Sequence, residues 1–148
     1  MIVTFTSCSI PKDIHGTLEK INKDKVLKIG YSNHPPFIQI KNGDSTGIEY
    51  KIMLALGEEM GVHLIFIEGT EAVLIEKIEK YEIDIIIAGL NSDSPWKSKA
   101  GFTNPYAKIN GKDYSIAVPP GENAFLVHVE KFINRNKEKI KSWINDKP

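Results

Sequence analysis

The sequence is poor in cysteine, with Cys8 as the single one among 148 residues. An internal disulfide is therefore excluded, and cysteine usage says nothing about the redox compartment. An excess of one charge sign is missing too, because 19 Lys and Arg residues balance 19 Asp and Glu residues. Without a net positive charge there is no overall field that favours nucleic acid, so we expect no nucleic-acid partner.

Long apolar runs and the common catalytic motifs are also missing. No run approaches the ~20 residues that a membrane-spanning helix needs. There is no Gly-x-Ser-x-Gly motif and no Gly-rich phosphate loop. The histidines His15, His34, His63 and His128 are scattered, and no two have metal-ligand spacing on a helix. We therefore expect neither an enzyme nor a metal or cofactor site.

The first residues, MIVTFTSCS, are apolar, then small, and reach Cys8. This order resembles the end of a bacterial lipoprotein signal, in which small residues precede a cysteine that becomes lipid-modified. The segment is shorter than such a signal and has no basic start. Residues 1–11 are therefore either the remnant of a lipoprotein signal, with an upstream true start and lipidation at Cys8, or a disordered tail with an ordinary thiol.

The remaining chain alternates strand-like and helix-like segments. Its 41% hydrophobic and 26% charged residues are ordinary for one soluble globular domain. Alternation of this kind predicts crossover connections and a mainly parallel sheet with helices on both faces. Strands are expected at 26–31, 62–67, 83–88 and 114–118, and helices at 12–24, 47–60, 71–81, 125–133 and 137–145. Residues 38–40 form an expected short arm that turns at 42–44, and residues 107–113 form a polar seam.

The stretch around residues 83–96 is where we expect function. The apolar, β-branched run 83–88 is typical of a strand buried on both faces. It ends at Gly89, where the backbone can approach a ligand closely, and the polar loop 91–96 follows. Ligands of open α/β sheets bind outside the carboxyl ends of the strands.

Four motifs along the chain resemble those of bacterial type II solute-binding proteins, and the amino-acid-binding family of ABC transporters is the nearest. The motifs are LKIG with PPF at 27–37, GIE at 47–49, DIIIAG at 84–89 and FTNPY at 102–106. Such proteins have two lobes that close on a ligand. Here Tyr106 is followed almost at once by residues 113–123, which resemble the returning strand and helix of lobe one. The resemblance implies an α/β fold, a single lobe of the periplasmic-binding-protein-like II type at 12–148, without the second lobe.

The same resemblance implies three ligand contacts on this lobe. The loop after the first strand usually supplies an aromatic residue, and His34 stands there between Tyr31 and Phe37. The loop after the third strand holds a ligand carboxylate, and Gly89, Asn91 and Asp93 stand there. An arginine that grips the α-carboxylate as a fork comes next. The implied ligand site is Tyr31, His34, Phe37, Gly89, Asn91, Asp93 and Trp96.

Trp96 occupies the position of that arginine, which changes the expected ligand. A free carboxylate would find little attraction beside Asp93, whereas an indole next to a carboxylate suits a cation, with cation–π contacts of ~0.5–2 kcal/mol. Alternatively, Trp96 packs on Phe37 or Phe102 and seals the loop.

Four other residues have structural alternatives. His34 can make a hydrogen bond within its loop instead of contacting a ligand. Asp93 and Ser94 can cap a short helical turn before a proline. Glu49, in the first turn of a helix, is expected to compensate the helix dipole rather than bind a ligand.

Two functions follow. The first is an extracytoplasmic solute-binding lobe of the periplasm or cell envelope, tethered through Cys8. It would recognise a small polar or amine-containing solute weakly, or as a homodimer through the open cleft face, and would serve a membrane transporter. The alternative is a degenerate lobe that acts as an interaction or regulatory module of an envelope complex. A third reading is a fragment of a longer gene that encodes the second lobe.

Overall fold

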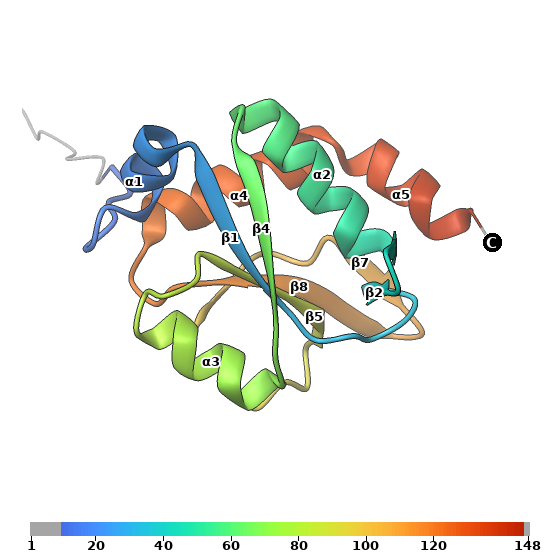
Figure 1. The fold of residues 1–148 in the computed structure, drawn as a ribbon. Helices are drawn as coiled ribbons and strands as arrows, with labels where there is room; N and C mark the ends of the chain where they lie inside the picture. The colour runs from blue at the N-terminus through green and yellow to red at the C-terminus, as the bar shows by residue number, and fades with distance from the viewer. Residues whose placement is uncertain (1–9, 147–148) are drawn as a thin grey trace, which may run out of the picture.

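The fold is an α/β lobe built on one mixed sheet (Figure 1). The computed structural model describes residues 10–146. Its strands are β1 (Val26–Tyr31), β2 (Gln39–Lys41), β3 (Asp44–Thr46), β4 (His63–Glu68), β5 (Ile85–Asn91), β6 (Gly101–Phe102), β7 (Ala107–Ile109) and β8 (Lys112–Val118). Its helices are α1 (Thr17–Asp24), α2 (Ile48–Met60), α3 (Glu71–Glu79), α4 (Asn123–Arg135) and α5 (Lys137–Asn145).

The parallel part of the sheet is its core, in the order β4-β1-β5. β8 continues the sheet beside β5 but runs antiparallel to it, and both β6 and β7 are antiparallel to β8. The prediction that the segment 114–118 joins the sheet is confirmed. The expectation of a mainly parallel sheet holds for β4, β1 and β5, whereas the other strands of this sheet pair antiparallel.

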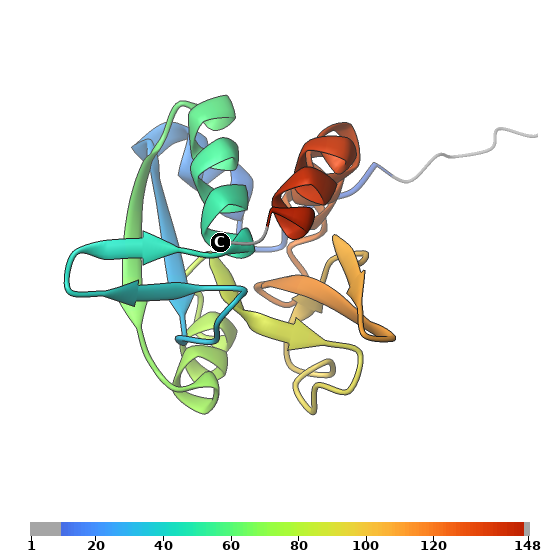
Figure 2. The same cartoon turned by 90° about the vertical axis from the view of Figure 1, so that its right-hand side faces the viewer.

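Short hairpins explain the antiparallel half. Asn110 and Gly111 have φ angles of 51° and 78°, a pair of left-handed residues that makes a two-residue turn between β7 and β8. Residues 107–113, expected to be a polar seam, are therefore mostly a hairpin. The arm expected at 38–40 is confirmed as the β2–β3 hairpin, which turns at Asn42 and Gly43 in the same way and projects from the lobe in Figure 2.

Helices cover both faces of the sheet, as predicted. In Figure 1, α1, α2, α4 and α5 lie above the sheet and α3 lies below it. Side chains of the central strand β5 alternate between these layers. Ile85 and Ile87 join the larger apolar cluster under the four helices, whereas Ile86 and Ala88 join the smaller cluster against α3. This alternation buries β5 on both faces.

The first helix begins later than expected because two carboxylates organise the chain before it. Asp13 accepts hydrogen bonds from the backbone N–H of Leu18 (2.8 Å) and of Phe125 (2.9 Å), and so caps α1 and α4 together. Glu122 accepts two more from the backbone N–H groups of residues 15 and 17. These four donors would otherwise stay unpaired at the two helix starts. Within residues 10–146, no helix has the length and apolar character needed to cross a membrane.

Candidate functional site

The candidate site lies where the three parallel strands end. β1, β4 and β5 finish at Tyr31, Glu68 and Asn91, and these ends share one edge of the sheet. β5 extends beyond its expected end because Gly89 has a φ of 62° and the pairing with β8 shifts register between Ile86 and Leu90. A bulge of this kind bends the strand beside a functional edge.

Gly89 forms the floor of the site, and two aromatic rings lie against it. A side-chain carbon at Gly89 would stand 2.7 Å from a ring carbon of Phe37 and 2.8 Å from Nδ1 of His34. The ring of His34 meets Phe37 edge-on at 5.3 Å, and Phe37 stacks on Tyr114 at 4.2 Å. Only glycine fits at this position.

His34 makes the loop hydrogen bond that was its structural alternative, and its contact with a ligand stays a prediction. Its Nδ1 lies 2.9 Å from the carbonyl oxygen of Ala88, so Nδ1 carries the proton and donates it in this loop hydrogen bond. The side chain nevertheless remains exposed, which leaves Nε2 as an acceptor at the open surface. The loop bond fixes the ring where a ligand can reach it.

A buried carboxyl group lies beneath this floor. Glu49 is 0% exposed. Its Oε2 accepts a hydrogen bond from the N–H of Gly89 (3.0 Å), and its Oε1 accepts one from the O–H of Tyr106 (3.0 Å). Glu49 thus ties the first turn of α2 to the β5 bulge and to the FTNPY motif. It does more than the dipole compensation expected of it.

Burial dominates the titration of this pair. It raises the pKa of Glu49 to about 7, and the hydrogen bonds from Gly89 and Tyr106 oppose that shift only partly. Burial also raises the pKa of Tyr106, and the neighbouring Glu49 charge raises it further. Tyr106 therefore keeps its proton and remains the donor.

The loop after β5 is held by its own side chains. Asn91 Oδ1 accepts a hydrogen bond from the backbone N–H of Asp93 (2.9 Å), and Ser94 Oγ accepts one from the backbone N–H of Trp96 (3.3 Å). The expectation that Ser94 can cap the following turn matches this geometry. Asp93 forms a solvent-exposed ion pair with Lys112 at 3.3 Å.

Trp96 turns toward α3. Its indole packs against the smaller apolar cluster, and its Nε1–H donates to Oε2 of Glu71 at 3.0 Å. The side chain is partly buried rather than fully exposed. At the position where an arginine was expected, Trp96 therefore packs against the lobe. This agrees with the alternative that Trp96 seals its loop, but it does so on the side of α3.

Side chains of both charge signs stand at this edge, and Lys97, exposed beside Trp96, adds a positive one. Glu68 ends β4 and accepts a hydrogen bond from Asn33 Nδ2 at 3.2 Å, and Glu71 follows on α3. Asp93 stands after β5, balanced by Lys112. Among the described residues, Glu68 and Glu71 take part in no ion pair, so the charge at these two residues favours a cation over an anion.

The sequence matches the family of bacterial extracellular solute-binding proteins, family 3, over residues 27–147. The chain belongs to this family. Its solute-binding lobe resembles the arginine-bound form of domain 1 from TmArgBP of T. maritima, with 26% identity and a TM-score of 0.67, covering 81% of this chain and 97% of that domain. A mutant of the same domain gives 25% identity and a TM-score of 0.75, with 82% and 98% covered. The resemblance to lobe one alone is thereby confirmed.

A lysine complex of a putative ABC-transporter binding component from Wolinella succinogenes shares the fold, with a TM-score of 0.70 at 12% identity over 80% of this chain and 94% of that one. Among curated proteins, membrane-bound lytic murein transglycosylase F of Vibrio parahaemolyticus is 31% identical over 94 residues, 63% of this chain and 18% of that protein. The enzyme of the same name from Pseudomonas putida is 31% identical over 97 residues, 63% and 20%. The chain spans about a fifth of the length of these relatives.

The solute-binding lobe gathers only part of the predicted ligand set. His34, Phe37 and Gly89 meet at the floor, but Phe37 is 4% exposed and supports the surface from below. Tyr31 is also buried and contacts the ring of Phe66 edge-on at 6.3 Å. Asn91 and Asp93 follow in the next turn, whereas Trp96 turns aside. Ligand contact by these residues stays a prediction, and Cys8 lies outside the described residues.

Four residues of the site were not among those predicted: Glu49, Glu71, Tyr106 and Tyr114. Glu49 and Tyr106 belong to two of the quoted motifs, so the signal was present, but motif letters do not reveal which side chains meet in the core. Within residues 10–146, no group of three or more His, Cys, Asp or Glu residues could hold a metal.

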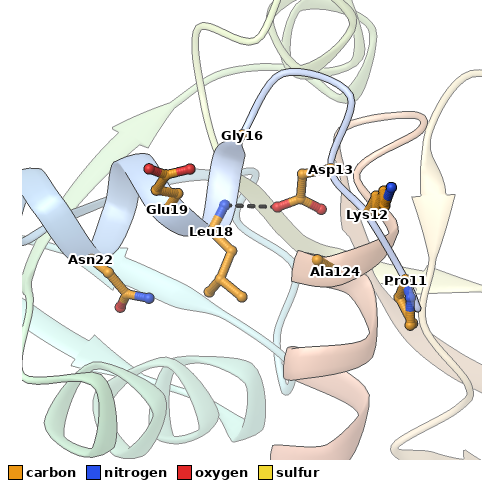
Figure 3. A pocket seen from close by; sticks show the side chains of 8 residues that line it. All are labelled: Pro11, Lys12, Asp13, Gly16, Leu18, Glu19, Asn22 and Ala124. Atoms are coloured by element: carbon orange, nitrogen blue, oxygen red, sulfur yellow. Dashed lines mark hydrogen bonds between the residues drawn. The ribbon is translucent and has the colours of Figure 1, made fainter.

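A hollow of about 540 Å³ lies away from this edge, between α1 and the start of α4 (Figure 3). Pro11, Lys12, Leu18 and Ala124 contribute to its lining. The carboxylate of Asp13 points into this region, but both of its oxygens already cap helices. Asp13 is therefore already engaged, and the other polar side chains that border the hollow are those of Lys12, Glu19 and Asn22.

Proposed function

We propose that this lobe binds a small solute through a cationic amine or guanidinium group at the carboxyl edge of β1, β4 and β5. The observation that carries the proposal is the identity of one residue, Trp96, in the loop that follows β5. Trp96 stands where the resemblance implies a carboxylate-gripping arginine, and its indole N–H is bonded to Glu71. With Glu68 at the end of β4, two strands from β5, the edge attracts the positive end of an amino-acid-like solute.

The arginine-bound form of domain 1 from TmArgBP supports this proposal, because that protein holds arginine on one isolated lobe. One lobe covers a ligand from one side only, so it removes less ligand surface from water than a closed clamshell. We therefore expect affinity in the micromolar to millimolar range. A homodimer through the open cleft face would enclose the ligand and tighten binding.

Titration calorimetry tests the proposal with arginine, agmatine and glutamate. Agmatine lacks the α-carboxylate of arginine, so it should bind at least as tightly, whereas glutamate should give no heat of binding. Glu68→Gln should weaken agmatine binding several-fold, because it removes one charge near the bound cation. The matched control Glu138→Gln, on exposed α5, should leave binding unchanged. If no solute binds more tightly than millimolar, the solute-binding role is wrong.

We also propose that the protein works in the cell envelope, anchored through Cys8, without catalytic activity of its own. The extracellular family supports this placement. Incorporation of radioactive fatty acid into the native protein, lost on Cys8→Ser, tests the anchor. A transporter of the membrane would then be the partner that receives the solute.

A regulatory module is the second candidate, favoured by the relatives named membrane-bound lytic murein transglycosylase F. In that role the loops after β1 and β5 would contact an envelope protein instead of delivering solute. Capture from envelope extracts should then recover one consistent partner that is lost when His34→Ala alters this surface. Recovery that does not depend on His34 would count against contact through this edge.

A further inference from the structure

Glu49 lacks a positively charged partner in the described part of the chain. None of the ion pairs within residues 10–146 includes it. Its two hydrogen-bond donors, the N–H of Gly89 and the O–H of Tyr106, are neutral. A carboxylate with no exposed surface is costly unless a cation compensates it. This cost persists in the core of the lobe unless the group is protonated or paired.

The place of Glu49 relative to the candidate site is set by backbone hydrogen bonds. The N–H of Glu49 donates to the carbonyl of Phe37 at 2.8 Å, and that of Ile48 donates to the carbonyl of Pro36 at 3.2 Å. The carboxyl end of Glu49 reaches Gly89, on which His34 and Phe37 rest. One layer of backbone and ring therefore separates the carboxyl group from the open edge.

The groups that face Glu49 from the surrounding elements add no compensating charge. β5 offers the N–H of Gly89, and the FTNPY segment offers the O–H of Tyr106. β8 contributes Tyr114, stacked on Phe37. The loop after β1 contributes His34, whose Nδ1–H is already given to the carbonyl of Ala88.

We propose that Glu49 is the buried counter-charge of the bound solute, so that a cation at the open edge beside His34 is attracted by it across the layer of Gly89 and the two rings and displaces the carboxyl proton to solvent. This inference rests on the proposed function. Because the pKa of Glu49 is raised to about 7, a large share of its carboxyl groups carry a proton near neutral pH, and this proton can be displaced. A positive charge nearby favours the ionised carboxyl and lowers that pKa, so cation binding and proton release are linked.

Calorimetry of agmatine in two buffers of different ionisation enthalpy measures the released proton. At pH of about 6.5, the wild type should release up to about one proton per agmatine bound. Its affinity should rise by up to about tenfold per pH unit as pH increases toward about 7, and then level off. Glu49→Gln should release none and lose this pH dependence. The glutamine keeps an oxygen for the N–H of Gly89 and an amide donor for Oη of Tyr106.

His34 needs its own variant, because a histidine beside the site can add charge in acid. His34→Gln should still release the proton if Glu49 supplies it. Carbon-13 NMR of the glutamate carboxyl groups gives a direct second measurement on the wild type. Saturating agmatine should lower the pKa of Glu49 by about one unit or more, and this decides the matter even if Glu49→Gln does not fold.

The outcomes separate the two proposals. If agmatine binds without releasing a proton and the carboxyl titration of Glu49 stays unchanged, the counter-charge role is wrong while solute binding stands. If the proton release disappears in His34→Gln and persists in Glu49→Gln, the counter-charge role is likewise wrong. If agmatine at about 10 mM does not bind the wild type, the proposed function fails, and the counter-charge role falls with it.

Discussion

At the residue scale, Glu49 makes stability depend on pH in an unusual direction. Its ordinary pKa is 4.5, and burial raises the pKa to about 7 in the folded lobe. Between these values the folded state keeps a proton that the unfolded state has lost. Stability should therefore be highest at and below pH 4.5 for this group and should fall as pH rises to about 7. Each pH unit across that window costs up to about 1.4 kcal/mol.

Urea unfolding at pH between about 5 and 8 checks this expectation, with Glu49→Gln as the comparison. The free energy of unfolding of the wild type should fall relative to the variant by about 1–3 kcal/mol over this range. The Glu49→Gln variant has no titrating group at position 49. Burial lowers the pKa of His128, but His128 is present in both proteins, so the difference between them reports on Glu49 alone. A constant difference at every pH would show that the buried carboxyl does not titrate there.

Gly89→Ala is the second prediction at this scale. The new carbon would lie 2.7 Å from the ring of Phe37 and 2.8 Å from that of His34, in a backbone with a φ of 62°. We expect a loss of about 2–4 kcal/mol from strain and crowding together. Gly61→Ala is the matched control, because it has a φ of 64° and nothing within 4 Å, and so pays only about 1 kcal/mol of backbone strain. Equal melting temperatures for the two variants would contradict the crowding.

At the scale of elements, repetitive patterns explain what could be predicted. β1 (Val26–Tyr31) and α5 (Lys137–Asn145) lie where apolar periodicity places them. β7 escaped prediction because three residues are too few for a periodic signal, although the Asn110-Gly111 pair that turns it is a known hairpin signature. The end of β5 was misplaced because a bulge lets the strand continue past a glycine that otherwise suggests a loop.

The paired helix starts give a prediction at the element scale. Asp13→Ala removes the acceptor for two backbone N–H groups, one on α1 and one on α4, and should cost about 1–2 kcal/mol. The matched control is Thr70→Ala, which removes one long bond of 3.4 Å to the backbone of Val73 and should cost less than about 1 kcal/mol. Thermal unfolding by circular dichroism compares them. A larger loss at Thr70 would mean that the shared cap contributes little.

At the scale of the whole molecule, topology explains how far the site could be predicted. Parallel strands bring their carboxyl ends together, so the loops holding His34 and Gly89 were expected to meet, and they do. The direction of Trp96 depends on its bond to Glu71, which is distant in sequence. Contacts of this kind follow from tertiary packing and leave no local pattern in the sequence, which is also why the burial of Glu49 could not be anticipated.

Ligand binding should stabilise the lobe as one unit, because β5 belongs to both apolar clusters and couples its two faces. A solute that binds only the folded state at ten times its Kd adds about 1.4 kcal/mol to the free energy of unfolding. For a domain of this size, the Tm should rise by about 2–5 °C in a single transition. Differential scanning calorimetry with agmatine checks this, and glutamate at the same concentration is the control. A rise with glutamate as large as with agmatine would mean that the edge does not select for positive charge.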